Sequence, residues 1–401
     1  MRRMPLLPLT AIVLAALAGP SSAASGQHRP ENALRHVLQQ DADSVVEAGS
    51  PGILAQLSTG DGSIKIRSGY GDVAQRSPVP WSAQFRIASF SKTFVATTLL
   101  QLVGEGRLSL DDSVDKWLPG RVSGNGNDGS KITVRQLLQH TSGLPDYMLG
   151  LLPIFTEPGF RQHRFDAHNS DELVALAMRY PPTFAPGTDW RYSNTNYVLA
   201  GMIITKVTGR DWRAEVHDRI IDRLHLDHTF IPGARTRLPN PHAIGYQRFP
   251  DDPESANPFF GAFVDVTELN PSFADAAGEI ISTTDDGNRF LRALIGGRLL
   301  ASAQLKEMQN TVPAPELAGA WPGARYGLGL LWTPNSCGGA WAHAGDIQGF
   351  QTRNGVSPDG KRSVMVSLNT DSVIPKDSST IPSSPVDPSA KLIDHALCGV
   401  K

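Results

Sequence analysis

The chain has 401 residues, with 37 lysines and arginines against 39 aspartates and glutamates, and its formal net charge is −2. A surface with so balanced a charge excludes nucleic acid and anionic membranes as natural partners, because both select strongly basic proteins. The length suffices for a large core and for two lobes.

The first 24 residues have the pattern of a secretory signal peptide. Two arginines precede an apolar run from Leu6 to Leu17, and small residues follow it up to Ala24. The run is too short for a membrane span, and Pro8 interrupts it. No cysteine follows that could carry a lipid anchor, and no later segment is apolar enough to cross a bilayer. We expect an exported, soluble mature chain with no stable membrane anchor.

Strand–turn–strand patterns occur near both ends of the chain, the first of them after a helical stretch at 31–47. Alternating apolar residues bounded by Gly-, Asp- and Pro-containing turns predict the strands 52–57, 63–67, 350–356 and 363–368. We predict an α/β (α+β) fold in which both chain ends build one antiparallel sheet flanked by helices.

The middle of the chain has helical spacing, with predicted helices at 134–140, 171–178 and 197–209. We therefore predict a sheet lobe formed by residues 25–107 and 279–401 and a mostly helical lobe formed by 108–278, with the active site between them. The Ser- and Pro-rich segment 371–388 is expected to be a long exposed loop before a final helix.

A serine and a lysine open an otherwise apolar predicted helix, Arg86 to Val103. Ser89 and Lys92 are three residues apart, so they are neighbours on one helix face. A charged lysine in the first turn opposes the helix dipole, whereas a neutral lysine there could take the proton of the serine hydroxyl. Ser113 and Lys116 have the same spacing, but they lie in an acidic loop that we do not expect to be catalytic.

Two further motifs supply the other groups that acyl transfer requires. Tyr192-Ser-Asn194 offers a phenol and an amide, and His343-Ala-Gly345 offers an imidazole at the start of a strand where glycine would let a substrate backbone approach closely. Each motif alone is more often structural. Together with the Ser–Lys pair they predict nucleophilic serine catalysis.

In this order the three motifs resemble those of the penicillin-recognising serine hydrolases, which include class C β-lactamases and secreted D-alanyl-D-alanine carboxypeptidases. The resemblance implies that Ser89 is the nucleophile, Lys92 its proton acceptor and Tyr192 a relay to the leaving group, although either Lys92 or Tyr192 could be the working base. Asn194 would hold the substrate amide. His343, where many relatives have lysine, would keep positive or polarisable character near Tyr192.

The resemblance also implies a set of substrate-binding positions. Backbone N–H groups of Ser89 and Asp346 would form the oxyanion hole. The substrate-binding residues would be Asn194, Ala344, Gly345, Asp346 and Phe273.

The only two cysteines, Cys337 and Cys398, are expected to form one disulfide that ties the C-terminal helix to the body, since an exported chain meets an oxidising environment. Two unpaired buried thiols are the alternative. Paired cysteines near the C-terminus also resemble the exported carboxypeptidase branch of the family.

The chain departs from that branch where the free carboxylate of a terminal D-alanine would bind. No basic residue follows Tyr326-Gly-Leu-Gly-Leu330, and Ala344 and Asp346 replace the expected hydroxyls. Residues two apart on a strand face the same side, so Asp346 would repel a substrate carboxylate. Alternatively, Asp346 turns away and a distant arginine serves. We expect weak carboxypeptidase activity and a preference for amides, esters or internal D-residue bonds.

Together these features predict an exported serine hydrolase with an acyl-serine intermediate, most simply a D-alanyl-D-alanine carboxypeptidase-like D-peptidase or amidase. An esterase, a class C-like β-lactamase or a covalent penicillin-binding sensor are the alternatives. Its partners would be small peptides, esters or β-lactams. No cofactor and no metal are expected, and the oligomeric state stays open. His217, His225 and His228 lie among charged residues on an expected solvated helix and turn, which is no pattern for a zinc site.

Overall fold

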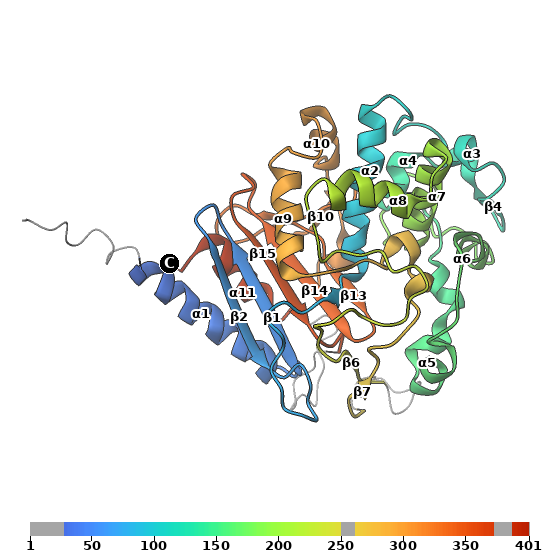
Figure 1. Cartoon of the computed structure of the whole chain (residues 1–401). Coiled ribbons are helices and arrows are strands. Elements are labelled where there is room, and N and C mark those ends of the chain that lie inside the picture. The colour runs from blue at the N-terminus through green and yellow to red at the C-terminus, as the bar shows by residue number, and fades with distance from the viewer. Residues whose placement is uncertain (1–27, 250–260, 373–386, 401) are drawn as a thin grey trace, which may run out of the picture.

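The computed structural model describes residues 28–249, 261–372 and 387–400 (Figure 1). The expected signal peptide lies outside these residues, as does most of the expected loop at 371–388. No helix within the described ranges is long and apolar enough to cross a membrane.

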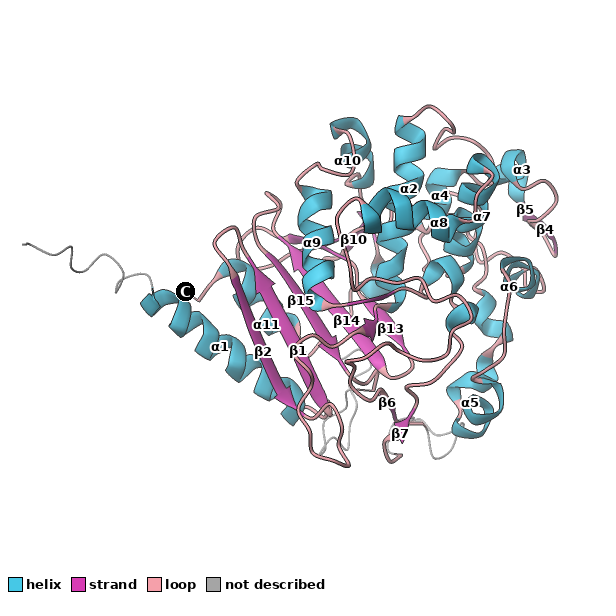
Figure 2. Cartoon of the chain, in the orientation of Figure 1, coloured by secondary structure: helices cyan, strands magenta, loops and turns pink. Residues whose placement is uncertain are grey.

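Both ends of the chain form the main antiparallel sheet, as predicted (Figure 2). Its nine strands run in the order β2-β1-β15-β14-β12-β11-β10-β9, and β13 pairs with β14. The strands are β1 (Gly52–Ser58), β2 (Ser63–Gly69), β9 (Val312–Pro313), β10 (Arg325–Tyr326), β11 (Leu331–Thr333), β12 (Ala340–Ala342), β13 (Gly345–Ile347), β14 (Phe350–Val356) and β15 (Ser363–Leu368). Strand β1 pairs antiparallel with β15, which joins the two halves of the predicted sheet.

Helices cover both faces of this sheet. On one face, α1 (His28–Glu47) and α11 (Ala390–Cys398) pack their apolar residues on alternate positions of β1, β2 and β15. On the other face, α9 (Thr284–Ile295) contacts the intervening positions, and the Asn288 amide donates to the backbone oxygen of Gln56 at 2.8 Å. This alternation is the period-2 pattern that predicted the strands.

Helices dominate the middle of the chain. They are α2 (Ser91–Gly104), α3 (Val114–Trp117), α4 (Val134–Gln139), α5 (Glu157–His163), α6 (Ser170–Ala177), α7 (Thr195–Thr208) and α8 (Trp212–Val216), followed later by α10 (Ser302–Met308). Three short strand pairs connect them, namely β3 (Phe85–Arg86) with β8 (Ile281–Ser282), β4 (Ser123–Gly124) with β5 (Asn127–Asp128), and β6 (Tyr246–Gln247) with β7 (Val264–Asp265). Helix α2 is buried nearly all round, because α7, α8 and α10 pack around it.

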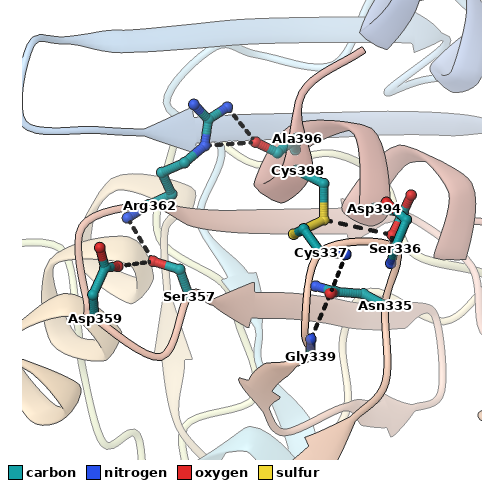
Figure 3. Close-up of a disulfide and its surroundings, with 10 residues drawn as sticks. All are labelled: Asn335, Ser336, Cys337, Gly339, Ser357, Asp359, Arg362, Asp394, Ala396 and Cys398. Carbon is teal, nitrogen blue, oxygen red and sulfur yellow. Dashed lines mark hydrogen bonds between the residues drawn. A yellow bond between two sulfur atoms is a disulfide. The ribbon is translucent and has the colours of Figure 1, made fainter. Parts of the chain in front are cut away.

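A disulfide between Cys337 and Cys398 fastens α11 to the loop before β12 (Figure 3). The Asn335 side chain organises that loop by accepting hydrogen bonds from the backbone N–H groups of Cys337 and Gly339. On the other side of α11, the Arg362 guanidinium donates to the Ala396 carbonyl at 2.7 Å. The last helix is therefore held at its end by a covalent bond and by hydrogen bonds.

Candidate active site

Ser89 lies in a single 3₁₀ turn, Ala88–Phe90, that leads directly into α2. Ala88 has a left-handed backbone with φ = 49°, which is uncommon for a residue with a side chain. The turn is anchored beforehand by β3 and by the Ile87 N–H, which donates to the Ile280 carbonyl at 2.9 Å. The hydroxyl of Ser89 is half-buried, so it remains accessible at the head of a buried helix.

The Lys92 amine lies beside Ser89 and is fully buried. Its Nζ is 3.0 Å from Ser89 Oγ, 2.8 Å from Asn194 Oδ1 and 2.7 Å from the Ala277 carbonyl. A neutral amine has two hydrogens and one lone pair. If the hydrogens are donated to Asn194 and Ala277, both of which are acceptors there, the lone pair is directed at the Ser89 hydroxyl.

Burial lowers the pKa of Lys92 from 10.5 to about 7, and the carboxylate of Asp146 opposes that shift. A substantial fraction of Lys92 is therefore unprotonated near neutral pH. This is the condition that a lysine must meet to act as a general base.

Tyr192 lies over the lysine. Lys92 Nζ is 4.8 Å from the centroid of its ring, and the His140 ring lies 4.3 Å away on a tilted contact. Burial raises the pKa of Tyr192 well above its ordinary value, while Ser89 favours the phenolate to a smaller extent. The Tyr192 hydroxyl is buried without a hydrogen-bond partner among the described residues. A neutral phenol in this position has a proton to donate to a leaving group.

Asn194 is held from both sides within the protein. Its Oδ1 accepts from Lys92, and its Nδ2 and backbone N–H both donate to Asp146 Oδ2 at 2.9 Å. We expected this amide to hold substrate, but its contacts in the structure orient the lysine. The sequence analysis did not identify Asp146 as a site residue, because it precedes its partner Asn194 by 48 residues. No local pattern around Leu144-Pro145 indicates this contact.

His343 lies in the bend between β12 and β13 and differs from what we expected of it. Its Nδ1 bonds the Ala344 carbonyl at 2.7 Å, so this nitrogen must carry hydrogen, and Nε2 then accepts from the Tyr326 hydroxyl at 2.7 Å. Burial, assisted by Lys92, lowers the pKa of His343 to about 3. The ring is neutral and bonded to Tyr326, so of the positive or polarisable character expected near Tyr192 it can supply only the second.

Gly345 permits a close approach, but of the chain to itself. A side-chain carbon at Gly345 would lie 2.2 Å from the Ile87 carbonyl and 3.0 Å from the Ser89 nitrogen. The glycine therefore allows β13 to pack against the Ser89 turn. This contact brings the backbone of β13 next to the nucleophile. The approach of a substrate backbone at Gly345 stays a prediction.

Asp346 has a cationic partner that the sequence did not reveal. Arg353, on the neighbouring strand β14, donates to Asp346 at 2.8 Å and also bonds the buried Asp387. The side chain of Asp346 is 48% exposed, whereas that of Arg353 is only 9% exposed. Asp371 lies in the same cluster, and its pKa rises to about 7 because it is buried and faces Asp346. The Asp346 carboxylate is therefore the group of this cluster that solvent reaches, and the nearby Arg353 partly offsets its charge.

Two other expected positions lie less close to the chemistry. Ala344 is half-buried. Ala344 and Arg353 are among the residues that line a cavity of about 330 Å³. Phe273 ends a 3₁₀ turn, Pro271–Phe273, and packs partly against the main core. The second Ser–Lys pair with the same spacing has structural roles. Ser113 caps the N-terminus of α3, and Lys116 forms an ion pair with Asp112.

A search of known families matches the Beta-lactamase model to residues 33–382. The chain belongs to the Beta-lactamase family. One relative, penicillin-binding protein 4* of Bacillus subtilis (strain 168), is 28% identical to this chain over 301 residues. These residues cover 71% of this chain and 60% of that protein. Protein flp of Staphylococcus aureus (strain NCTC 8325 / PS 47) is 30% identical over 55% of this chain and 44% of its own length. The chain therefore spans about half of the length of these two relatives.

Solved structures of the family are similar over a greater length. A D-stereospecific amidohydrolase from Streptomyces sp. has a TM-score of 0.80 and 41% identity, covering 92% of this chain and 99% of that one. The D-amino acid amidase from Ochrobactrum anthropi SV3 has a TM-score of 0.72 and 31% identity, covering 84% and 91%. The protein is thus a member of the Beta-lactamase family with the predicted antiparallel-sheet fold.

Proposed function

We propose that this protein is an exported D-stereospecific amidohydrolase, which cleaves amides and esters of D-amino acids or D-peptides through an acyl-Ser89 intermediate. The observation that carries the chemistry is the buried amine of Lys92, 3.0 Å from the Ser89 hydroxyl and with a pKa of about 7.

The proposed reaction has two steps of the same kind. Lys92 takes the proton of Ser89 as its oxygen attacks the substrate carbonyl, and the amine or alcohol leaves with a proton from Tyr192. Tyr192 regains its proton from Lys92, and a water molecule then attacks the acyl-serine with the reverse proton transfers. Lys92 is the base in this scheme, because the pKa of Tyr192 is too high for a phenolate at neutral pH.

The substrate class rests on two supports of different kinds. The two similar solved structures are described as a D-stereospecific amidohydrolase and a D-amino acid amidase. The exposed carboxylate of Asp346 beside the Ser89 turn favours neutral or cationic substrate ends over a free carboxylate. Arg353 weakens this repulsion, since it pairs with Asp346, but it also pairs with Asp387 and so does not cancel it.

Export is supported by the N-terminal pattern of arginines, apolar run and small residues, and by the disulfide between Cys337 and Cys398. Disulfides persist mainly in oxidising compartments.

The test compares kcat/KM for a D-aminoacyl amide, its L enantiomer, a D-methyl ester and a free-acid D-Ala-D-Ala peptide. We expect the D-amide and D-ester to exceed the free acid by about tenfold, which corresponds to a free energy within the range of one partly screened charge contact. The L enantiomer should also be cleaved more slowly than the D-amide, as for a D-stereospecific enzyme. Asp346→Thr should narrow the gap to the free acid, and Ser89→Ala should abolish turnover.

A tenfold preference of the wild type for the free acid would instead identify a carboxypeptidase. One equivalent of product from a β-lactam or ester, followed by no turnover, would identify a covalent sensor.

A further inference from the structure

A buried ion-pair network joins Arg213 to Asp275 and Glu279, and it contacts neither Ser89 nor Lys92 directly. Arg213, on α8, binds Glu279 with Nε at 2.5 Å and a terminal nitrogen at 3.1 Å. The same terminal nitrogen donates to Asp275 at 3.1 Å. The side chains of Glu279 and Asp275 are 0% and 3% exposed. Burying two carboxylates around one arginine costs desolvation free energy. We therefore asked what this network holds in place.

The network encloses the short segment that carries the Ala277 carbonyl. Asp275 begins this segment with a left-handed backbone, φ = 41°, and Glu279 ends it. Besides Arg213, Asp275 accepts from the indole N–H of Trp212 at 2.9 Å and from the hydroxyl of Ser170 at 2.5 Å. Both ends of the segment are therefore fixed by side chains from α6 and α8, and an unusual backbone angle is held in place.

The segment also touches the nucleophile's side of the site. The Ile280 N–H donates to the Ser91 hydroxyl at 3.1 Å, and Gly278 packs against the backbone of Ala88. Between these contacts, the Ala277 carbonyl accepts from Lys92 at 2.7 Å. The Ala277 carbonyl belongs to a single 3₁₀ turn, Asp275–Ala277, so its position depends on what holds that short turn.

We propose that Arg213, Glu279 and Asp275 are positioning residues that hold the Ala277 carbonyl against Lys92, and so keep the lone pair of the amine directed at Ser89. This inference rests on the proposed chemistry of Ser89 and Lys92. If the carbonyl moves, Asn194 alone holds the amine, which can then rotate about its last bond, and the base loses its orientation. Misplacement of a catalytic group by about 1 Å can cost on the order of 10²-fold in rate.

The chain offers a matched control in the same region. Arg219 lies shortly after α8. It pairs with the buried Glu215 at 2.6 Å and also with Glu105. Its network contacts α2 near its end and does not include the Ala277 segment. Arg213→Gln and Arg219→Gln therefore both remove an arginine from a buried glutamate, although Glu215 keeps Arg210 as a second partner at 3.0 Å. Only the first variant should affect the lysine.

The experiment measures three quantities for both variants. The first is the rate at which a fluorophosphonate labels Ser89, the second is the split between kcat and KM for a D-aminoacyl ester, and the third is the melting temperature. For Arg213→Gln we expect labelling and kcat to fall together by about tenfold or more, with KM within about twofold of wild type. Arg219→Gln should lower the melting temperature while labelling stays at the wild-type rate. Arg213→Lys, which restores one ionic contact, should recover part of the loss.

Wild-type labelling rates in folded Arg213→Gln would overturn the inference, as would equal losses in both variants. If Arg213→Gln does not fold, Glu279→Gln serves as the second variant. It removes the charge and one of the two acceptor oxygens that Arg213 uses, and it should lower the labelling rate in the same way. A wild-type protein that fluorophosphonate does not label would count against the proposed function itself, and is distinguishable from either result.

Discussion

Burial of the Lys92 amine sets the chemistry at the scale of single residues. A pKa of about 7 for an amine that normally titrates at 10.5 corresponds to roughly 5 kcal/mol. Between these two pH values the unfolded chain binds a proton at this lysine that the folded chain does not. This group alone therefore makes the free energy of unfolding rise with pH from about 7 to 10.5. The fold accepts a less stable native state at neutral pH in exchange for a reactive amine.

The acidic limb of the pH–rate profile should report this lysine. Activity requires the neutral amine, so kcat/KM should fall as the pH drops below about 7. Asp146 raises the pKa of Lys92, and Asp146→Asn should therefore move the limb to lower pH, by about one unit. The asparagine can still accept a hydrogen bond from the Asn194 N–H.

Kinetics of hydrolysis between pH 4 and 9 check this prediction, with Asp166→Asn as the control. Asp166 is an exposed aspartate that pairs with His163. An unmoved or raised limb in Asp146→Asn would show that a different group controls the rate.

At the scale of elements, the active site depends on how closely β13 approaches the 3₁₀ turn ahead of α2. Gly345 lies at that contact, and a side chain there would overlap the Ile87 carbonyl. The overlap involves backbone on both sides, so no flexible group can yield. Movement of β13 would also displace the backbone of Asp346, which lies next in the strand.

Gly345→Ala should therefore lower kcat/KM by about 10²-fold or more and lower the free energy of unfolding by about 1–3 kcal/mol. Gly60→Ala is the control, because a side-chain carbon at Gly60 would meet no atom within 4 Å. Urea denaturation and ester hydrolysis measure the two effects. Wild-type activity in Gly345→Ala would mean that the strand and the turn are not in contact during catalysis.

The elements themselves were largely predictable. The strands at 350–356 and 363–368 have the predicted bounds, because their alternation and the Pro-Asp-Gly turn are local signals. The Ser89–Lys92 pair was also predictable, since both residues belong to one helical turn. Helix α2 was harder, because burial on all sides leaves no polar face to read.

Contacts between distant segments were not predictable in the same way. Asp146 and Tyr326 reach the site only through the tertiary fold, and each meets its partner with no common sequence pattern. The neutral state of His343 follows from burial, which a single sequence does not show. The pairing of Asp346 with Arg353 depends on the register between β13 and β14.

At the scale of the whole molecule, the two ends of the chain are fastened together. Asp41 in α1 binds His395 in α11 at 2.7 Å, and Lys391 lies 3.5 Å from the same carboxylate. The disulfide then ties α11 to the loop before β12. The helix that closes the sheet is therefore held by its packing, by ion pairs and by a covalent bond.

Replacing both cysteines, as Cys337→Ala with Cys398→Ala, should lower the free energy of unfolding by about 4 kcal/mol, as expected for a closed loop of this length. Activity at 25 °C should stay within about twofold of wild type, because neither cysteine is among the groups that bond Ser89 or Lys92. Thermal and urea unfolding with and without a reductant check this. Reductant should destabilise the wild type and leave the double variant unchanged; an equal response of both would exclude the disulfide as the cause.

The pairing of β1 with β15 also dictates an order of events during biosynthesis. Strand β1 is synthesised long before its neighbour β15, because the two strands lie far apart in the sequence. Until β15 arrives, β1 and β2 form only a two-stranded hairpin with one unpaired edge, which is marginal in water. Assembly of the sheet must therefore wait for β15, and pairing between strands so far apart in the sequence is slow to form. A chain with this topology therefore stays incompletely folded until β15 is available for pairing.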